Sequence, residues 1–556
     1  MEDNGKSKSQ RRIFSAKAFP EKKVALTPMA SSPAMGLQNW FSNPRRDVLS
    51  GLVVAFAMIP EAIAFSGIAG VDPRVGLFGA FCLSITIAFV GGRTAMITSA
   101  TGSTALLMTG LVATGNARGE GLGLAYLMAA GILTGVFQIL WGYLRLAYQM
   151  RFVPLGVLSG FVNALALLIF QAQLPQLGIN LHFGEAGHDH AMHALSGSQM
   201  AVVWPLVLLG LVIIYGLPRI TRALPSQLIA IIVITAISMG LSSIFPDLNI
   251  PKVEDLGKLP NGLPMFNLPF GDISNQRVPF NLETFGIVLP TALSISLVGL
   301  METFLTQDIL DERTDSNSNK NTEAKGQGIA NIVSSLFGGM AGCALVGQSV
   351  MNIDNGGRTR LSTLSSGISL LAMILLASTW LKQIPMAALV AVMIGIAVST
   401  ADVAGLRNIR NIPKSDTAVM VMTFAVTMLT TPHNLALGVL AGVALAGVLF
   451  SRKVAKVIRV EAIKISEDES RYVVSGQLFF VSKIYFLQGF DVHDHPARIT
   501  IDMSQAHIWD QSGVGALNQL IRKLRLGGSV VNVEGLNKES LNLFERIGSQ
   551  PEGGHG

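Results

Sequence analysis

The stretch VLSGLVVAFAMIPEAIAFSG, residues 48–67, has one charged side chain, Glu61, and is otherwise apolar or small. About 20 such residues in a row are enough for a helix to cross a bilayer. Similar segments follow as far as residue 451, although the one at 345–353 is too short to span alone. We expect membrane segments near residues 48–67, 75–91, 98–114, 122–143, 154–174, 201–217, 226–245, 284–307, 326–341, 345–353, 361–381, 385–402, 416–432 and 434–451. These fourteen segments predict a polytopic α-helical membrane protein.

The overall composition supports this fold class. The chain has 556 residues, of which 50% are hydrophobic and only 14% are charged, and its mean hydropathy is +0.49. Soluble domains usually carry about 25% charged residues. The composition therefore excludes a disordered chain and argues against a soluble enzyme. The 57 glycines fit a membrane protein, in which small residues let neighbouring helices approach closely.

The basic side chains indicate the topology. Part of the net charge of +6 lies in residues 1–45 and in short loops. This distribution is typical of a membrane protein, whose loop charges set its orientation, rather than of a nucleic-acid-binding protein. Residues 1–45 contain no apolar segment that would act as a cleavable signal. If the N-terminus is inside, the inner loops carry 13 Lys and Arg residues and the outer loops carry 6. We therefore expect both termini in the cytoplasm.

The composition changes after residue 451. A basic segment, Arg452–Arg459, leads into sequence that is typical of a soluble domain. Alternating apolar residues predict strands, and apolar residues at spacings of three and four predict helices. We expect strands at 473–481, 498–503 and 529–533 and helices at 513–526 and 541–547. The chain is thus divided into an N-terminal tail (1–45), a transmembrane domain (46–451) and a small α/β domain with a C-terminal tail (452–556).

Two carboxylates lie inside apolar segments. Glu61 is within residues 57–65, and Glu302 is within VGLMETFLT at 298–306. A charged carboxylate in mid-bilayer costs at least about 2.5–3.5 kcal/mol, so it must face a cavity, pair with a cation or hold a proton. The alternative is a position at a helix end near the lipid headgroups. Thr306 follows Glu302 by one helical turn and therefore shares its helix face.

Two polar, glycine-containing segments predict helices that begin inside the membrane. They are TSATGST at 98–104 and GCALVGQS at 342–349. A helix that begins at mid-depth presents free N–H groups and the positive end of its dipole, which is an anion site without a basic side chain. Glu61 precedes Thr101 by 40 residues and Glu302 precedes Gly347 by 45, so the two segments occupy similar places in two halves of the chain. Broken helices in corresponding positions point to a transporter site, although small residues also serve helix packing.

Several motifs in these segments resemble the sulfate permease (SulP) family of anion transporters, in its bacterial branch. They are IPEAIAF at 59–65 with GVDP at 70–73, GGR at 91–93, GQGIAN at 326–331, FGGM at 337–340 and GGRTRLS at 356–362. The resemblance implies fourteen segments in two inverted seven-helix repeats, arranged as a core and a gate domain. It also implies an anion held between the starts of the third and tenth helices and moved past the gate in an elevator-like motion.

The resemblance assigns roles to particular residues. It implies a coupling ion held at Glu61, Glu302 and Thr306. The anion-binding positions that it implies are Thr98, Ser99, Ala100, Thr101 and Gly102 in the third helix start and Val346, Gly347, Gln348 and Ser349 in the tenth. Gln348 aligns with an Arg of prestin-like relatives, so no fixed cation balances the anion here. This difference favours symport, with a proton or a sodium ion as the coupling ion.

The expected function is secondary active transport of a small anion such as sulfate, bicarbonate or a C4-dicarboxylate, coupled to protons. The alternatives are a sodium-coupled symporter, an uncoupled exchanger or channel of the same family, and a sensor that signals through the C-terminal domain. We expect a homodimer in the cell (inner) membrane, surrounded by lipid, with no enzyme activity and no nucleic-acid partner. Substrate class remains open, because backbone dipoles discriminate poorly among these anions.

The segment IWDQSGVGAL at 508–517, between a strand and a helix, resembles a STAS domain. The resemblance matches Ser512 to the phosphorylatable serine of anti-sigma antagonists; the alternative is that Ser512 only caps the helix. Polar residues elsewhere carry less weight. Gln138 and Asn163 either line an interface between the core and gate domains or bond neighbouring helices. No metal site or cofactor is expected. The cysteines, Cys82 and Cys343, lie apart from one another. No cysteine lies beside the cluster of histidine and aspartate residues, which comprises His188, Asp189, His190 and His193.

Overall fold

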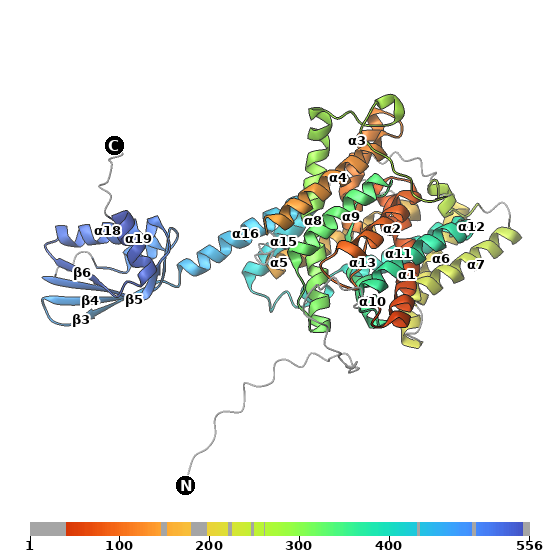
Figure 1. The fold of residues 1–556 in the computed structure, drawn as a ribbon. Coiled ribbons are helices and arrows are strands. Elements are labelled where there is room, and N and C mark those ends of the chain that lie inside the picture. The colour runs from red at the N-terminus through yellow and green to blue at the C-terminus, as the bar shows by residue number, and fades with distance from the viewer. Residues whose placement is uncertain are drawn as a thin grey trace, which may run out of the picture. The chain divides into compact units, whose positions relative to one another are not determined.

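The structure is a computed structural model that describes residues 40–145, 153–179, 197–220, 225–245, 249–260, 262–430, 434–491 and 496–548. Each of the fourteen expected segments contains a helix. Among these residues, eight helices are long and apolar enough to cross a membrane. The helices of the membrane region are α1 (Pro44–Ala69), α2 (Pro73–Val90), α3 (Gly102–Arg118), α4 (Leu122–Tyr143), α5 (Leu155–Gln171), α6 (Gly197–Ile220), α7 (Ser226–Ile244), α8 (Leu282–Thr314), α9 (Lys320–Leu336), α10 (Val346–Asp354), α11 (Arg360–Leu376), α12 (Ser378–Lys382), α13 (Met386–Thr400), α14 (Val403–Arg407), α15 (Lys414–Leu429) and α16 (Leu435–Ala455) (Figure 1).

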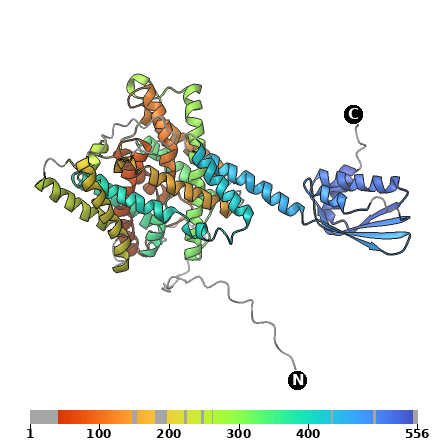
Figure 2. The same cartoon turned by 180° about the vertical axis from the view of Figure 1, so that it is seen from behind.

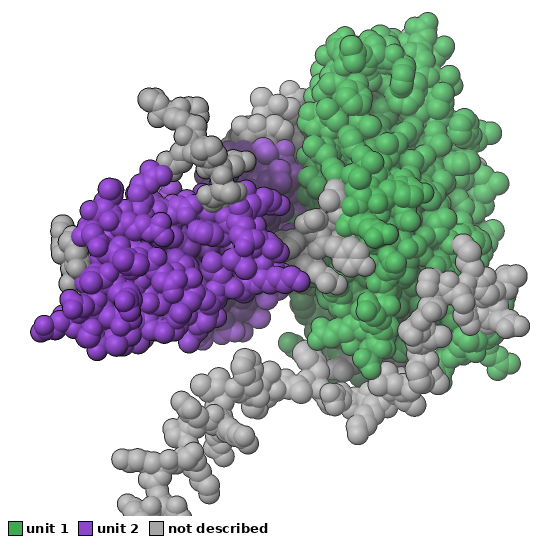
Figure 3. All heavy atoms as spheres, turned by 60° about the vertical axis from the view of Figure 1, so that its left-hand side comes forward, with its two compact units in different colours: residues 1–151, 165–399 green, residues 152–164, 400–556 purple. Residues whose placement is uncertain are grey.

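The chain divides into two compact units (Figure 3). The first unit comprises residues 1–151 and 165–399, and the second comprises residues 152–164 and 400–556. Within the second unit, Ser159 Oγ donates to Asp402 Oδ2 over 2.6 Å, and Asn163 Oδ1 accepts from the Asp402 N–H over 3.0 Å. Asn163 therefore bonds a neighbouring segment of its own unit.

The first unit contains a bundle in which α4 packs against α8 and α9, while α1 and α2 pack against α11. Glycines allow the close approach of α4 and α9. A Cβ at Gly131 would lie 2.0 Å from Ser335 Oγ, and a Cβ at Gly135 would lie 2.4 Å from the Gly328 carbonyl oxygen. These helices are thus in near backbone contact, which larger residues would prevent.

Helix α9 differs from the sequence prediction at both ends. It was expected over 326–341 but runs from Lys320 to Leu336. Asn319 caps it, because its Oδ1 accepts from the N–H groups of Asn321 and Thr322 at 3.0 and 3.1 Å. The first turns of α9 are polar and therefore give no apolar signal, although several of these side chains are buried.

The C-terminal domain is a four-stranded sheet with helices over it (Figures 1 and 2). The sheet order is β3-β4-β5-β6; β3 pairs antiparallel with β4, and β4, β5 and β6 are parallel. Its elements are β3 (Arg459–Lys464), β4 (Glu469–Leu478), α17 (Lys483–Gln488), β5 (Arg498–Ile508), α18 (Gln511–Leu526), β6 (Val530–Glu534) and α19 (Lys538–Gly548). The apolar residues expected on one helix face are buried against the sheet: Val514, Leu517, Leu520 and Leu524.

The sequence did not predict β3. We expect the basic segment Arg452–Arg459 only to lead into the C-terminal domain, but α16 continues to Ala455 and β3 begins at Arg459. Five of the six residues of this edge strand are exposed, so it lacks the apolar alternation by which a strand is predicted.

Prediction one concerns the contact between α4 and α9. Gly135→Ala should lower the melting temperature of the purified protein by several degrees, because the added Cβ meets the Gly328 carbonyl at 2.4 Å. Gly286→Ala on α8 is the matched control, since a Cβ there meets nothing within 4 Å. The control should melt at or slightly above the wild-type temperature, because Ala favours a helix over Gly by about 1 kcal/mol. Equal melting temperatures for both variants would contradict the close packing.

Prediction two concerns an ion pair of the C-terminal domain. Arg471 Nη2 lies 2.7 Å from Asp502 Oδ2 and lowers the pKa of that carboxyl to about 2. The unfolded pKa is about 3.9, so the pair stabilises the fold above about pH 4 and this contribution is lost as the pH falls towards 2.

Pepsin cleavage within 459–548 of the full-length protein should therefore be faster in Arg471→Met than in the wild type at about pH 4, and equally fast near pH 2. Lys464→Met, on the exposed edge strand, is the control. A rate difference that is the same at both pH values would refute the assignment.

Candidate anion-binding site

Two short strands bring the third and tenth helix starts together. Strand β1 (Thr98–Ser99) pairs antiparallel with β2 (Cys343–Ala344), with Thr98 opposite Ala344 and Ser99 opposite Cys343. Helix α3 begins directly after β1, and α10 begins directly after β2. Because the strands are antiparallel, the two helices leave the pair in opposite directions with their N-termini towards it. The two segments that the sequence marked in separate halves therefore lie side by side in the fold.

The two helix starts are capped differently. At α3, Thr101 is the N-cap, and its Oγ1 accepts from the Thr104 N–H over 3.4 Å. At α10 the N-cap is Leu345, which offers no side-chain acceptor. The first turn of a helix has N–H groups without helical partners, and these favour a bound anion. Gly347 lies in this turn of α10 and is exposed, and a Cβ there would meet nothing within 4 Å, so space is open beside these N–H groups.

Four side chains form a closed set of hydrogen bonds beside the strand pair, which we name the Glu302 ring: Thr101, Ser103, Glu302 and Cys343. Glu302 Oε2 accepts from Ser103 Oγ and, over 3.0 Å, from Cys343 Sγ. Thr101 Oγ1 completes the ring, at 3.3 Å from Cys343 Sγ and 3.0 Å from Ser103 Oγ. The ring joins α3, α8 and β2.

Helix α8 also fixes the position of β2. Thr306 Oγ1 lies 2.9 Å from the Glu302 carbonyl oxygen and 3.4 Å from the Ala344 carbonyl oxygen, so its hydroxyl lies one turn from Glu302, facing β2. Thr303 Oγ1 accepts from the Ala344 N–H over 3.2 Å. Thr306 and Glu302 thus lie together against the strand pair, as their spacing predicted.

Glu61 lies at the other helix start. It is buried in the interior of α1, where Gln348 of α10 interacts with its carboxyl, and its Oε2 has no hydrogen-bond partner among the described residues. Glu302 is likewise interior to α8, where it is half-buried and bonded to other members of the ring. Neither carboxylate lies at a helix end, which argues against the headgroup alternative.

The remaining predicted anion-binding residues have varied surroundings. Ser349 is fully buried, and its Oγ accepts from the Ile97 N–H over 2.9 Å, so its hydroxyl holds the segment before β1. Gly102 is enclosed, since a Cβ there would lie 2.9 Å from Ile169 and 3.1 Å from Phe65. The other predicted positions in these two starts are buried or half-buried: Thr98, Ser99, Ala100 and Val346.

Two members of the ring were missed by the sequence interpretation. Ser103 lies in the polar start that had been singled out, but only its contact with α8 distinguishes it. Cys343 lies in the second polar start, but no role was assigned to its side chain, because its long-range contact with Glu302 leaves no mark in the sequence. Gln138 has a neighbouring helix as partner, because its Oε1 accepts from Asn331 Nδ2 over 2.8 Å.

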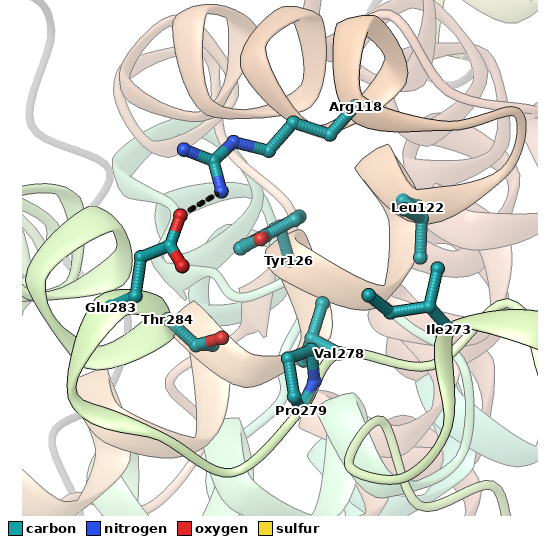
Figure 4. A pocket seen from close by; sticks show the side chains of 8 residues that line it. All are labelled: Arg118, Leu122, Tyr126, Ile273, Val278, Pro279, Glu283 and Thr284. Carbon is teal, nitrogen blue, oxygen red and sulfur yellow. Dashed lines mark hydrogen bonds and ion pairs between the residues drawn. The ribbon is translucent and has the colours of Figure 1, made fainter.

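A pocket elsewhere in the first unit is separate from this site (Figure 4). Arg118 and Glu283 form an ion pair of 2.6 Å at its rim. Arg118 ends α3, fifteen residues after Ser103, which corresponds to about 22 Å along the helix. The pocket is lined by Arg118, Leu122, Tyr126, Ile273, Val278, Pro279, Glu283 and Thr284. It therefore lies at the opposite end of α3 from the helix start.

Two sequence interpretations concern residues outside the ring. Ser512 is the second residue of α18, and the N-cap is Asp510, whose Oδ1 accepts from the Gly513 N–H over 2.9 Å. The interpretation of Ser512 as the cap is therefore wrong. His188, Asp189, His190 and His193 lie outside the described residues.

The sequence matches the family model "Sulfate permease family" over residues 45–423 and the model "STAS domain" over residues 461–552. The chain belongs to the sulfate permease family. This family consists of transporters rather than enzymes, and its members share a helical membrane fold that here carries a C-terminal STAS domain. The expected family and fold class are thereby confirmed.

Two related proteins are named as transporters of anions. A putative sulfate transporter, YbaR of Bacillus subtilis, is 44% identical over 513 residues, covering 92% of this chain and 98% of the relative. The bicarbonate transporter BicA of Picosynechococcus is 30% identical over 455 residues, covering 79% of this chain and 77% of the relative. The chain is thus a multi-pass membrane protein of an anion transporter family.

Solved structures share the fold. The transmembrane domain of a cyanobacterial bicarbonate transporter BicA matches with a TM-score of 0.60 at 28% identity, covering 73% of this chain and 98% of that one. The murine anion transporter Slc26a9 in its inward-facing state matches with a TM-score of 0.76 at 18% identity, covering 95% of this chain and 92% of that one. The second likeness concerns the fold alone.

Prediction three concerns the open space at α10. Gly347→Val should fold like the wild type, because its Cβ meets nothing within 4 Å, but should raise the KM for anion uptake about tenfold by filling the space beside the first-turn N–H groups. Gly447→Val on α16 is the matched control, since its Cβ is equally unobstructed. Uptake kinetics in proteoliposomes give the measurement. An unchanged KM in Gly347→Val would mean that the anion does not approach α10.

Proposed function

We propose that the protein is a symporter that moves a small anion together with a proton across the cell (inner) membrane, by an elevator-type alternation of access. The observation that carries this proposal is the Glu302 ring beside the two helix starts. The segments 98–104 and 342–349 contain no Lys or Arg, and a carboxylate is the ionisable group in contact with them. These two segments therefore supply no fixed cation to balance a bound anion.

This arrangement links anion binding to protonation. An ionised Glu302 repels an anion held at the start of α3 or α10, whereas a protonated Glu302 does not. Binding of the anion and binding of the proton then favour one another to the same extent, because the coupling between two sites is reciprocal. Cotransport follows if the transporter changes its access from one side of the membrane to the other when it carries both the anion and the proton or neither, but not when it carries only one of them.

The composition of the ring favours a proton over a metal cation. Hydroxyl and thiol groups donate to Glu302, and the sulfur of Cys343 occupies one position beside it at 3.0 Å. Hard cations prefer oxygen ligands, and sulfur is a soft ligand. Sodium coupling is the second candidate, because the hydroxyl of Thr306 and the carbonyl of Ala344 lie near Glu302 as oxygen ligands.

We also propose the substrate classes, the membrane topology, the oligomeric state and a site of regulation. Sulfate, bicarbonate and C4-dicarboxylates are the proposed substrate classes, and the relatives named above as sulfate and bicarbonate transporters support the first two. The ratio of 13 to 6 basic residues in alternate loops supports both termini in the cytoplasm. We also propose a homodimer and a regulatory role for Ser512, where a phosphate would lie at the N-terminus of α18.

Prediction four tests proton coupling. In sodium-free proteoliposomes, adding the transported anion outside should acidify the lumen, because each anion enters with a proton. Sulfate, bicarbonate and succinate are added in turn, with protein-free vesicles to correct for CO2 entry. Glu302→Gln should abolish the acidification without lowering the melting temperature. Glu283→Gln, an exposed carboxylate on the same helix, should behave like the wild type.

The outcomes separate the candidates. Undiminished uptake driven by a pH gradient in Glu302→Gln would remove this carboxylate from the mechanism. If none of the anions acidifies the lumen, proton symport of these substrates is wrong. Tracer uptake with and without a sodium gradient then distinguishes sodium symport from uncoupled exchange.

A further inference from the structure

Helix α9 carries buried polar residues that the transport proposal does not use. Glu323, Gln327 and Asn331 recur every four residues and therefore lie on one face of the helix. All three are 0% exposed. Buried polar groups in a membrane protein are costly unless they are hydrogen-bonded, so this face must have specific partners.

Gln327 contacts the anion-binding segment directly. Its Nε2 donates to Thr98 Oγ1 over 2.8 Å and to Glu323 Oε1 over 2.9 Å. Glu323 Oε2 in turn accepts from the N–H groups of Gly92 and Arg93, at 2.7 and 3.0 Å. Helix α9 thus holds the segment 92–98 at both of its ends, and the second end is β1.

Asn331 holds the partner strand. Its Oδ1 accepts from the Gly342 N–H over 2.8 Å, and its Nδ2 lies 3.2 Å from the Gly342 carbonyl oxygen. Gly342 immediately precedes β2 and admits no side chain, because a Cβ would lie 2.0 Å from the Ser99 carbonyl oxygen. One face of α9 therefore fixes both strands of the pair.

The same segment is tied to the helix that carries Glu302. Arg93 Nε lies 2.8 Å from Asp311 Oδ1, and Arg93 Nη2 donates to Thr314 Oγ1 over 2.7 Å. Asp311 and Thr314 belong to the end of α8. A chain of contacts thus connects the end of α8 to the candidate site. It consists of an ion pair and hydrogen bonds and passes through Arg93, Glu323 and Gln327 to Thr98.

We propose that Gln327 is a positioning residue for the anion, supported by Glu323: it holds β1 at the height where the start of α3 meets the start of α10. This inference rests on the proposed anion site at the β1–β2 pair. Gln327 acts through Thr98 and does not touch the anion. Its loss should weaken anion binding, because a shift of β1 moves the N–H groups of α3 relative to those of α10.

The first test replaces the side chain by one of similar length without hydrogen-bonding groups. Gln327→Met should raise the KM for anion uptake, and the Kd for the same anion, about tenfold, while kcat per folded transporter stays within about threefold. Gln173→Met is the matched control, because Gln173 is also buried but its Nε2 donates to the Ile169 carbonyl of its own helical turn, at 3.4 Å, rather than to the strand pair. A purely structural role would instead lower the yield and melting temperature of Gln327→Met and leave KM unchanged, which would overturn the proposal.

The second test exchanges the two partners. Gln327→Glu alone places two carboxyl groups at the position of a 2.9 Å contact and should weaken binding at least as much as Gln327→Met. The double variant Glu323→Gln with Gln327→Glu again has one amide and one carboxyl group. It should recover the wild-type KM to within about threefold, a departure from additivity that marks directly interacting residues. Additive effects of the two substitutions would overturn the pairing.

Binding is measured without transport, so that this proposal and proton coupling can fail separately. Sulfate, bicarbonate and succinate are each titrated into the purified protein, and the rise in melting temperature gives Kd, because a ligand of the native state stabilises it. A weakened Kd in Gln327→Met supports the positioning role even if no lumenal acidification is found. If none of the three anions stabilises the wild type, both the site and the positioning role are wrong.

Discussion

The antiparallel pairing of Thr98 with Ala344 and of Ser99 with Cys343 is the constraint on which the site depends. In a bilayer, non-helical backbone is tolerated only where protein or a water-filled cavity surrounds it. Protein groups meet this need here: Ser84 Oγ donates to the Thr98 carbonyl over 2.9 Å, and Thr303 Oγ1 accepts from the Ala344 N–H. The surrounding helices therefore supply the hydrogen-bond partners that allow non-helical backbone at this place. Two helices can then begin here, each with its N-terminus at the strand pair.

The two halves of the chain contribute to one another's helix starts. Glu61 belongs to the first half, but its carboxyl interacts with Gln348 in α10 of the second half. Glu302 belongs to the second half, and it accepts from Ser103 in α3 of the first half, as well as from Cys343. In the folded chain each carboxylate thus contacts the helix start of the other half, so both halves contribute to the candidate site.

How much the sequence predicts depends on whether the signal is local. The segments and the two polar starts were predictable, because each is a run of neighbouring residues with a composition that the membrane restricts. Three features were not predictable from the sequence: the role of Cys343 in the ring, the early start of α9 at Lys320, and strand β3. Cys343 matters through a contact with Glu302, 41 residues away. The first turns of α9 are polar although partly buried, since their partners are other helices, and β3 is an exposed edge. Ser512 was located correctly, but Asp510 caps its helix.

The carboxyl groups of Glu302 and Glu323 differ in the kind of donor that each one meets, and this difference supports the proposal that Glu302 exchanges a proton whereas Glu323 has a structural role. Glu323 Oε2 accepts from two backbone N–H groups, which donate only and hold that oxygen as an acceptor. Glu302 Oε2 accepts from a hydroxyl and a thiol, which can rotate and accept in turn, so a proton on Glu302 finds a partner as readily as its absence does. A carboxyl group between helices therefore fixes the geometry at Glu323, and under the proposed mechanism it changes its charge at Glu302.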